Sequence, residues 1–369
     1  MRAARLEEEN ARLRKELEEA RHPKPVEEPK PEAPPRAVGS SARGPLIIGV
    51  AVVFTFIVIL LTTGVLTKAP IGAPVQQAKT LAPSPSIEDP PANRPPPDWN
   101  EESHFTEIDI RAVTHGVKPQ VHYAVGAGGT ILRKYGDAWK WTLETSGTTN
   151  DLHGVAEQLG KVCAVGDNGV ATCALDPAKP TWKLEKTGTT ADLLALTEHY
   201  GFLAVGRHGV IMHRTDDGWQ REESGTKEDL FGVSGDYVVG AHGTILAVAD
   251  NRWRKVESPT TADLYAVESH LHEVVVVGAG GVILQLGDPR AGFQLVKSGV
   301  TTDLYAVAHG SAFDSYAAGA GGVVLSTSGG SAPWVRQNID TTRDLHTIDA
   351  WLPMMFIAGD HGTVLSRKY

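Results

Sequence analysis

The sequence is poor in the residues that carry covalent and metal chemistry. It has 2 cysteines in 369 residues, and its 14 histidines are scattered along the chain. It lacks a metalloprotease helix, a nucleophile elbow and a Walker loop, the motifs that would place a metal, a nucleophile or a phosphate. We therefore expect a protein that is not an enzyme and uses no cofactor or metal.

Basic residues are scarce in the larger part of the chain. Residues 99–369 hold 22 Lys and Arg against 32 Asp and Glu, which gives a net charge of −10. Phosphate binding needs clustered Lys and Arg that displace counterions. The shortage excludes nucleic acid as an expected partner.

Charge is absent altogether from residues 45–67. Such an apolar run, at about 20 residues, crosses a bilayer as a helix. It lies too far from the N-terminus for a cleaved signal peptide. Three basic residues precede it within 30–44 and two follow it within 68–79, which favours a cytoplasmic N-terminus. We expect a single-pass protein of a bacterial inner membrane, with everything after residue 67 in the periplasm.

The segments around this run look like a helix and two linkers. Residues 22–44 and 68–98 are rich in proline and read as extended linkers. Within residues 1–21, Leu6, Asn10, Leu13 and Leu17 follow heptad spacing. This charged helix predicts either a short parallel homodimeric coiled coil or a solvated helix without a partner, since two heptads alone are marginal.

One pattern repeats seven times between Trp99 and Tyr369: an aromatic residue, an Asp ten positions later, then a Gly-x-x-Gly turn. The aromatic residues are Trp99, Trp141, Trp182, Trp219, Trp253, Phe293 and Trp334. The acids are Asp109, Asp151, Asp192, Asp229, Asp263, Asp303 and Asp344. The turns begin at Gly126, Gly166, Gly206, Gly240, Gly278, Gly319 and Gly359. A period of about 39 residues is typical of a propeller blade.

Each repeat contains four short runs of β-forming residues, which predicts a four-stranded meander. The sequence thus predicts an all-β fold, a seven-bladed β-propeller over residues 99–369. The chain stops after a third strand, so we expect the segment from Trp99 to Phe105 to supply the outer strand of the last blade, beside Thr363 to Arg367.

The two faces of this propeller differ in their loops. The aromatic-to-Asp spacing and the Gly-x-x-Gly turn keep one length in all repeats, whereas the loops of the opposite face vary. We expect a candidate binding surface on the variable face, although ordinary loop residues would look the same. Its members are His115, Lys118, His122, Tyr200, Phe202, His270 and His272.

The seven aspartates allow two roles. They begin the innermost strands, so they would either accept hydrogen bonds within the blades or form a collar for a cation or a basic partner; we favour the structural role. The second residue inside each Gly-x-x-Gly turn is Gly, Asn or His, which all tolerate positive φ. Backbone conformation therefore explains the three histidines there better than metal binding.

The two cysteines flank one of these turns. Cys163 and Cys173 fall opposite each other if the turn at Gly166 carries a one-residue bulge. A disulfide would fit an oxidising compartment, and two buried cysteines that never pair are the alternative.

The repeat unit Trp-x9-Asp-Leu-x2-Val followed by Val-Gly-x-x-Gly-x-Ile-Leu resembles the seven-bladed propellers of the photosystem II stability/assembly factors. The resemblance covers residues 99–369 and is best over 189–212 and 261–284. A fainter likeness to Asp-box propellers, which include sialidases, rests on residues 215–219. The first resemblance implies a non-enzymatic chaperone or scaffold that holds a membrane-protein partner.

Three functions follow as hypotheses. The leading one is a membrane-anchored propeller scaffold or assembly factor that binds another protein of the cell envelope. The alternative is a carbohydrate-binding or sialidase-like propeller, which needs arginines gathered in one pocket. The available arginines are Arg111, Arg133, Arg207, Arg214, Arg252 and Arg343. The third is a spacer that dimerises through residues 6–17.

Overall fold

The structure, a computed structural model, describes residues 99–102, 107–116, 121–135, 140–176, 181–270, 273–310, 314–329, 332–351 and 354–368. The predicted N-terminal helix, both linkers and the apolar run at 45–67 lie outside these residues. So do Lys118 and His272. Within the described part of the chain, no helix combines the length and the hydrophobicity needed to cross a bilayer.

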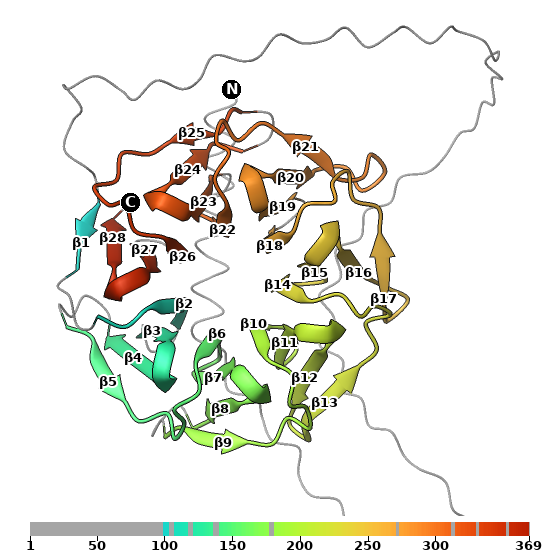
Figure 1. The fold of residues 1–369 in the computed structure, drawn as a ribbon. Coiled ribbons are helices and arrows are strands. Elements are labelled where there is room, and N and C mark those ends of the chain that lie inside the picture. The colour runs from blue at the N-terminus through green and yellow to red at the C-terminus, as the bar shows by residue number, and fades with distance from the viewer. Residues whose placement is uncertain are drawn as a thin grey trace, which may run out of the picture. The chain divides into compact units, whose positions relative to one another are not determined.

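The described residues form seven antiparallel sheets of four strands, arranged as blades around a central channel, so the predicted propeller is confirmed (Figure 1). Blade 1 consists of β2 (Ile110–Gly116), β3 (Val121–Gly126), β4 (Thr130–Tyr135) and β5 (Thr142–Glu144). Blade 2 consists of β6 (Leu152–Gln158), β7 (Lys161–Gly166), β8 (Ala171–Ala174) and β9 (Lys183–Glu185). Blade 3 consists of β10 (Leu193–Glu198), β11 (Phe202–Gly206), β12 (Ile211–Thr215) and β13 (Gly218–Glu222). Blade 4 consists of β14 (Leu230–Ser234), β15 (Tyr237–Gly240), β16 (Ile245–Ala249) and β17 (Arg252–Val256). Blade 5 consists of β18 (Leu264–His270), β19 (Glu273–Gly278), β20 (Ile283–Leu286) and β21 (Gln294–Val296). Blade 6 consists of β22 (Leu304–His309), β23 (Ser315–Gly319), β24 (Val324–Thr327) and β25 (Val335–Arg336). Blade 7 consists of β26 (Leu345–Trp351), β27 (Met354–Gly359), β28 (Val364–Lys368) and β1 (Asn100–Glu101).

The core lies between neighbouring blades. The second strand of each blade is almost wholly apolar because both of its faces are covered, as in Phe202–Gly206, where every residue is buried. One cluster joins Ile110 and Trp141 of blade 1 to Phe356 of blade 7, and Trp141 is only 1% exposed. Sheets covered on both sides in this way expose only their outermost edges.

The ring closes through the two ends of the described chain, as predicted. β1 pairs with β28, with Asn100 opposite Ser366 and Glu101 opposite Leu365. The Glu102 N–H then donates to the Val364 carbonyl at 2.9 Å. Figure 1 shows β1 at the outer edge of blade 7, although β28 lies at the other end of the sequence.

Each blade also carries a tight turn between its second and third strands. These 3-10 turns are Ala127–Gly129, Asp167–Gly169, Arg207–Gly209, Ala241–Gly243, Ala279–Gly281, Ala320–Gly322 and Asp360–Gly362. Their middle residues all have positive φ, for example 60° at His208 and 56° at Asn168, so the prediction from the Gly, Asn and His pattern is confirmed. The preceding glycine is required for a different reason, because a Cβ on Gly126 would lie 2.0 Å from the Asp109 carbonyl oxygen.

Seven aspartates join these turns into a circle. The backbone carbonyl of each one accepts the first N–H of the turn in its own blade, as Asp263 does from Ala279 at 2.8 Å. Its side-chain Oδ1 accepts the middle N–H of the turn in the preceding blade, as Asp263 does from His242 at 2.8 Å. The same Oδ1 contact recurs at Asp151, Asp192, Asp229, Asp303, Asp344 and, from blade 7 back to blade 1, Asp109.

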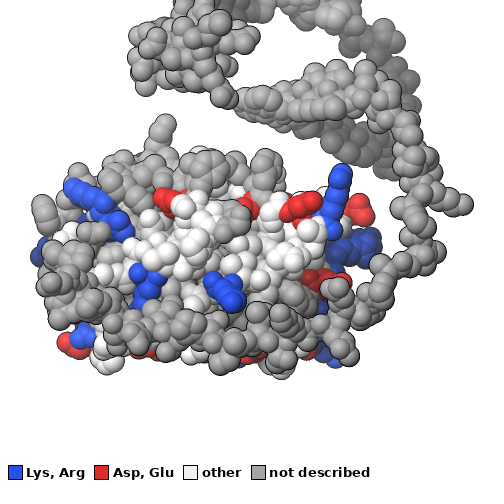
Figure 2. Space-filling model, turned by 90° about the horizontal axis from the view of Figure 1, so that it is seen from above, with Lys and Arg blue, Asp and Glu red and all other residues white. Residues whose placement is uncertain are grey.

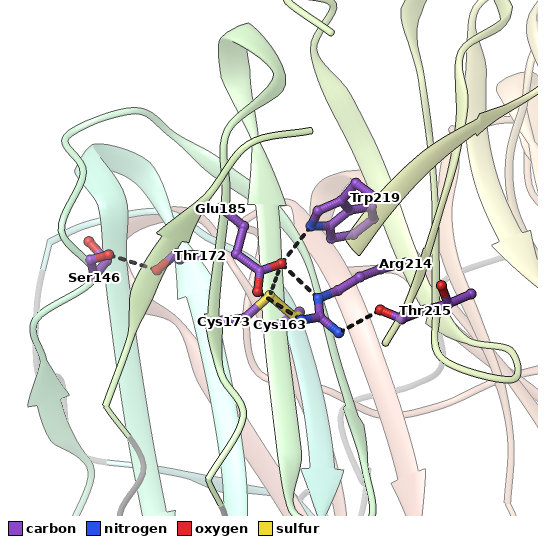
Figure 3. The surroundings of a disulfide bond; sticks show 8 residues. All are labelled: Ser146, Cys163, Thr172, Cys173, Glu185, Arg214, Thr215 and Trp219. Atoms are coloured by element: carbon purple, nitrogen blue, oxygen red, sulfur yellow. Dashed lines mark hydrogen bonds and ion pairs between the residues drawn. A yellow bond between two sulfur atoms is a disulfide. The ribbon is translucent and has the colours of Figure 1, made fainter. Parts of the chain in front are cut away.

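A second contact between blades lies near the rim, where a glutamate three residues after the aromatic residue binds the next blade's indole. Glu102 accepts the Trp141 Nε1–H at 2.9 Å and pairs with Lys134 Nζ at 2.6 Å, although the Lys134 side chain is only 6% exposed. Glu185 accepts the Trp219 indole at 2.9 Å and also pairs with Arg214 (Figure 3).

The two cysteines lie beside the second of these contacts. Cys163 on β7 is directly opposite Cys173 on β8, which confirms the predicted register, and the two form a disulfide. Figure 3 shows this disulfide next to the Glu185 carboxylate, which lies 3.7 Å from the Cys173 sulfur.

We predict that Glu102→Ala lowers the free energy of unfolding by about 3–5 kcal/mol, because it leaves the Lys134 charge buried without a partner. The double variant Glu102→Gln/Lys134→Met removes both charges, keeps an acceptor for the indole, and should recover most of this loss. Urea unfolding of the purified protein measures both, with the exposed Glu223→Ala as a control expected within about 0.5 kcal/mol of the parent. A loss at Glu102→Ala no larger than at the control would contradict the role assigned to this pair.

We further predict that Asp109→Ala destabilises the protein by about 1–2 kcal/mol, because the His361 N–H loses a charged acceptor. Asp109→Asn keeps an oxygen at the same place and should cost less than half as much. The measurement is again the urea midpoint. Equal losses in the two variants would show that the carboxylate does not act through this hydrogen bond.

Candidate functional site

The innermost strand of every blade contains a β-bulge at the same place. In blade 5, Leu264 pairs with Gly278 and Ala266 with Val277, so Tyr265 between them has no partner across the ladder. The bulged residue lies two positions after the Asp in all seven blades. The set, named here the bulge ring, is Arg111, His153, Leu194, Phe231, Tyr265, Tyr305 and His346.

Bulges redirect a side chain away from the pleat, and they occur often beside binding sites. The members of the bulge ring are half-buried, and four neighbouring pairs are in contact although their members lie about 40 residues apart in sequence. The ring of Tyr265 lies 5.8 Å from Phe231 and 5.6 Å from Tyr305, and Tyr305 lies 5.6 Å from His346. On the other side of the ring, Arg111 Nη1 lies 3.4 Å from His153 Nδ1. The innermost strands that carry these residues surround the central axis of the propeller in Figure 1.

A pocket opens between these side chains. It has a volume of about 390 Å³, and its lining residues are Asp109, Arg111, His153, Leu194 and His346. Four of these five belong to the bulge ring. A concave site of this size accommodates a side chain or a short extended segment, since small-molecule pockets have volumes of about 300–1,000 Å³.

The polar members of the ring are held by carboxylates. Arg111 Nη2 binds Asp151 at 2.8 Å, and His153 Nε2 lies 2.6 Å from Asp167. His346 makes the equivalent contact to Asp360 at 2.6 Å. The arrangement holds polar and aromatic surfaces in fixed positions, which suits binding.

The tyrosines of the ring remain neutral phenols. Burial raises the pKa of Tyr265, and the Asp303 and Asp263 carboxylates raise it further. Burial also raises the pKa of Tyr305, with Asp344, Asp303 and Asp360 adding to the effect. Among the described residues, no group of three His, Cys, Asp or Glu side chains has a geometry that would hold a metal ion.

Among the described residues predicted for the variable face, His115 and His122 lie opposite each other on β2 and β3 of blade 1, whereas the others belong to blades 3 and 5. Tyr200 is 88% exposed in blade 3, and His270 is exposed in blade 5. His115 instead pairs with Asp349 at 2.9 Å, and the ring of His122 packs 4.7 Å from Phe356.

Phe202 corrects the prediction, because it is only 1% exposed and belongs to the core between blades 2 and 3. It begins β11, a second strand covered on both faces, so its side chain packs inward.

The arginines proposed for a sialidase-like pocket are also dispersed. Arg133 binds Glu144 at 2.8 Å and Arg214 binds Glu185 at 2.7 Å, each near the rim. Arg207 binds two aspartates, Asp192 and Asp229, on the turn face, which is the face of the propeller that carries the seven 3-10 turns. In Figure 2 the propeller is seen from its rim, and the coloured basic and acidic side chains are scattered there among uncharged residues, with the two signs side by side in places.

The bulge ring was not predicted from the sequence, although a signal for it exists. The position two residues after Asp holds Arg, His, Leu, Phe, Tyr, Tyr and His in turn, while the residue before it is always Leu or Ile. A position that varies among repeats whose neighbouring residues are constant indicates that the fold does not determine the side chain there.

Glu268, on the innermost strand of blade 5, provides a prediction on the pH dependence of stability. Burial raises its pKa to about 7, and the Asp349 carboxylate adds to this effect. The hydrogen bond from Ser234 Oγ, at 3.4 Å, and the nearby His115 act in the opposite direction. The folded protein then binds a proton that the unfolded chain has released, so stability falls as pH rises from about 4.5 to 7. Glu268→Gln should gain about 1–3 kcal/mol over the parent between pH 5 and pH 8 in urea unfolding. A constant difference across this range would contradict the assignment.

Comparison with known proteins supports the fold. No family description matches the chain, and no curated protein matches its sequence. A structure of YCF48 bound to D1 peptide is 15% identical and covers 78% of this chain and 99% of its own, with a TM-score of 0.64. The WD40 β-propeller domain of Doa1 is 12% identical and covers 73% of this chain and 96% of its own, with a TM-score of 0.61. Virginiamycin B lyase from Staphylococcus aureus is 13% identical and covers 73% and 99%, with a TM-score of 0.64. YCF48 is a photosystem II assembly factor, so the resemblance seen in the repeat unit extends to the fold, while the lyase places an enzyme on the same architecture.

Proposed function

We propose that this protein is a non-enzymatic, membrane-anchored docking protein whose propeller holds a segment of a partner protein at the bulge ring. The partner belongs to the cell envelope, and holding it serves the assembly of an envelope complex. The binding site differs from the variable-face surface expected from sequence, because the ring gathers contiguous side chains that the variable face leaves apart.

The observation that carries this proposal is the set of seven β-bulges. Every blade contributes one side chain that the repeat does not determine, and these seven side chains either line one pocket or contact one another. Four of the seven are aromatic or imidazole rings in contact with one another, and rings of this kind supply much of the energy of protein interfaces. The YCF48 structure with its D1 peptide is a precedent for a peptide held by this fold.

The location follows from the chain outside the blades. The uncharged run at 45–67 supplies the anchor, and the proline-rich residues 68–98 space the propeller from the bilayer. The disulfide between Cys163 and Cys173 favours an oxidising compartment such as the periplasm. Residues 1–21 then lie in the cytoplasm, where the heptad pattern would pair two copies in parallel.

A glycan is the second candidate ligand, because tyrosine faces also stack on sugar rings. The sialidase-like form of this hypothesis needs several arginines around one carboxylate, and Arg111, Arg133 and Arg214 are each paired with a separate carboxylate. We therefore favour a polypeptide, and glycan binding becomes an outcome of the test.

We predict that a photoreactive phenylalanine analogue at Tyr305, in the full-length protein in its native membrane, crosslinks to one defined envelope protein. Phe231→Ala in the same chain should weaken this adduct severalfold, because it removes one end of the aromatic surface. The measurement is mass spectrometry of the adduct, with treatment by glycosidases to show whether it contains a glycan.

The matched control carries the same analogue at Leu143, which is 73% exposed on the outermost strand of blade 1. It should give no adduct with that protein. Identical adducts from both positions would show a nonspecific surface, and a glycan-only adduct from Tyr305 would replace the proposal by its alternative.

A further inference from the structure

The aspartates of the turn face are not equally neutralised around the ring. Oδ2, the oxygen not used for the turn, binds a guanidinium in three consecutive blades. Arg111 binds Asp151 Oδ2 at 2.8 Å. Arg207 bridges two blades, with Nε 3.1 Å from Asp192 Oδ2 and Nη1 2.9 Å from Asp229 Oδ2.

Blades 5 to 7 carry the equivalent aspartates without a guanidinium partner among the described residues, and the same holds for Asp109 of blade 1. As in the other blades, Oδ1 of each aspartate accepts a hydrogen bond from a turn N–H; this holds for Asp263, Asp303 and Asp344. Within the described residues, no Lys or Arg forms an ion pair with any of the three. Arg343, next to Asp344 in sequence, donates instead to the Thr363 hydroxyl at 3.1 Å.

The difference has a simple origin in the sequence. Arg207 is the first residue of its turn, from where it reaches the Asp of its own blade and the Asp of the next. The equivalent residues of blades 5 and 6 are Ala279 and Ala320. Between Asp263, Asp303 and Asp344 the chain therefore repeats the two carboxylates of the blade 3 site but not its guanidinium.

Aromatic rings line the channel beside the same three aspartates. The aromatic arc, defined as Phe231, Tyr265, Tyr305 and His346, runs through blades 4 to 7 with ring separations of 5.6 to 5.8 Å. Aromatic faces attract cations, most strongly where carboxylates are near and water is partly excluded. Burial does most to raise the pKa of both tyrosines, and nearby carboxylates raise it further: Asp303 and Asp263 at Tyr265, and Asp344, Asp303 and Asp360 at Tyr305.

We propose that blades 5 to 7 bind an arginine side chain of the partner polypeptide, bridged by neighbouring aspartates as Arg207 is and lying against the aromatic arc. This inference rests on the proposed docking function and specifies the chemistry of the docked segment. Arginine is favoured over lysine because its planar fork binds two carboxylates at once and stacks on rings. The −10 charge of residues 99–369 attracts such a segment over a longer range.

The test uses the purified full-length protein and short fluorescent peptides of Gly and Ser that contain two arginines, two lysines, two citrullines or two glutamates. Citrulline has the shape of arginine without its charge. We expect the arginine peptide to bind at least about tenfold more tightly than the citrulline peptide, the lysine peptide to fall between them, and added salt to weaken arginine binding. Equal binding of arginine and citrulline peptides, or preference for glutamate, would overturn the proposal.

The decisive variant is Ala279→Arg, which gives blade 5 the guanidinium that blade 3 already has. It should occupy Asp263 and Asp303 from within the chain and weaken arginine-peptide binding about tenfold or more, without loss of stability in urea. Ala127→Arg makes the same change of charge in blade 1, across the channel, and should weaken binding less than about threefold. Equal effects of the two would show that overall charge, and not this site, governs binding.

A second variant protects the test against failure of the first. Asp303→Asn keeps an acceptor for the Gly280 N–H and removes only the charge, and it should weaken arginine binding about fivefold or more, whereas the exposed Asp217→Asn should have no effect. If the Tyr305 crosslink forms but the arginine peptide shows no preference, the docking function stands and this inference falls. If the peptide binds as expected and the crosslink is absent, the inference about the site holds and the assigned partner is wrong.

Discussion

Each aspartate at the start of an innermost strand makes two hydrogen-bonding contacts that belong to different blades. Its carbonyl holds the turn of its own blade, and its Oδ1 holds the turn of the blade before, at 2.8 to 2.9 Å in all seven cases. Since the contact from His361 to Asp109 is equivalent to the other six, the circle of hydrogen bonds closes at the same place as the circle of blades. The first glycine of each turn lies against the carbonyl of the Asp in its own blade, and the second lies against a backbone carbonyl of the loop before the next Asp, as Gly126 does with Asp109 and Gly129 with Thr148. A side chain at either glycine would clash with this backbone, which explains why neither glycine varies among the seven repeats.

Because these hydrogen bonds hold the blades together, the residue two positions after the aspartate can vary without disturbing the fold. The bulge takes that residue out of the ladder, so neither strand pairing nor the core between blades decides its identity. Arginine, histidine, leucine and tyrosine therefore occupy the same position in different blades without change to the fold. The hydrogen bonds that join the blades and the side chain that varies from blade to blade therefore belong to neighbouring residues of the same strand.

The extent to which sequence predicts this structure follows the same division. The number of blades, the closure by Asn100 and Glu101, and the positive φ of His208 depend on local spacings that recur seven times, so the sequence predicts them. Phe202 was misplaced because burial depends on where its strand begins. The bulge depends on the register between two strands, which a single strand does not reveal. The pair of Glu102 and Lys134 joins blade 7 to blade 1 and exists only once the ring is closed.

The two oxygens of each aspartate connect the frame to the site. Oδ1 serves the turn in every blade, whereas Oδ2 is taken by the chain's own arginines at Asp151, Asp192 and Asp229. A guanidinium bound at the Oδ2 of Asp263 and Asp303 would not compete with the turn N–H groups, because these use the other oxygen. A ligand at this site therefore leaves the hydrogen bonds between blades intact and neutralises charge that the fold otherwise holds close together. Binding should then stabilise the ring, since like charges around the channel mouth repel one another until a cation lies between them.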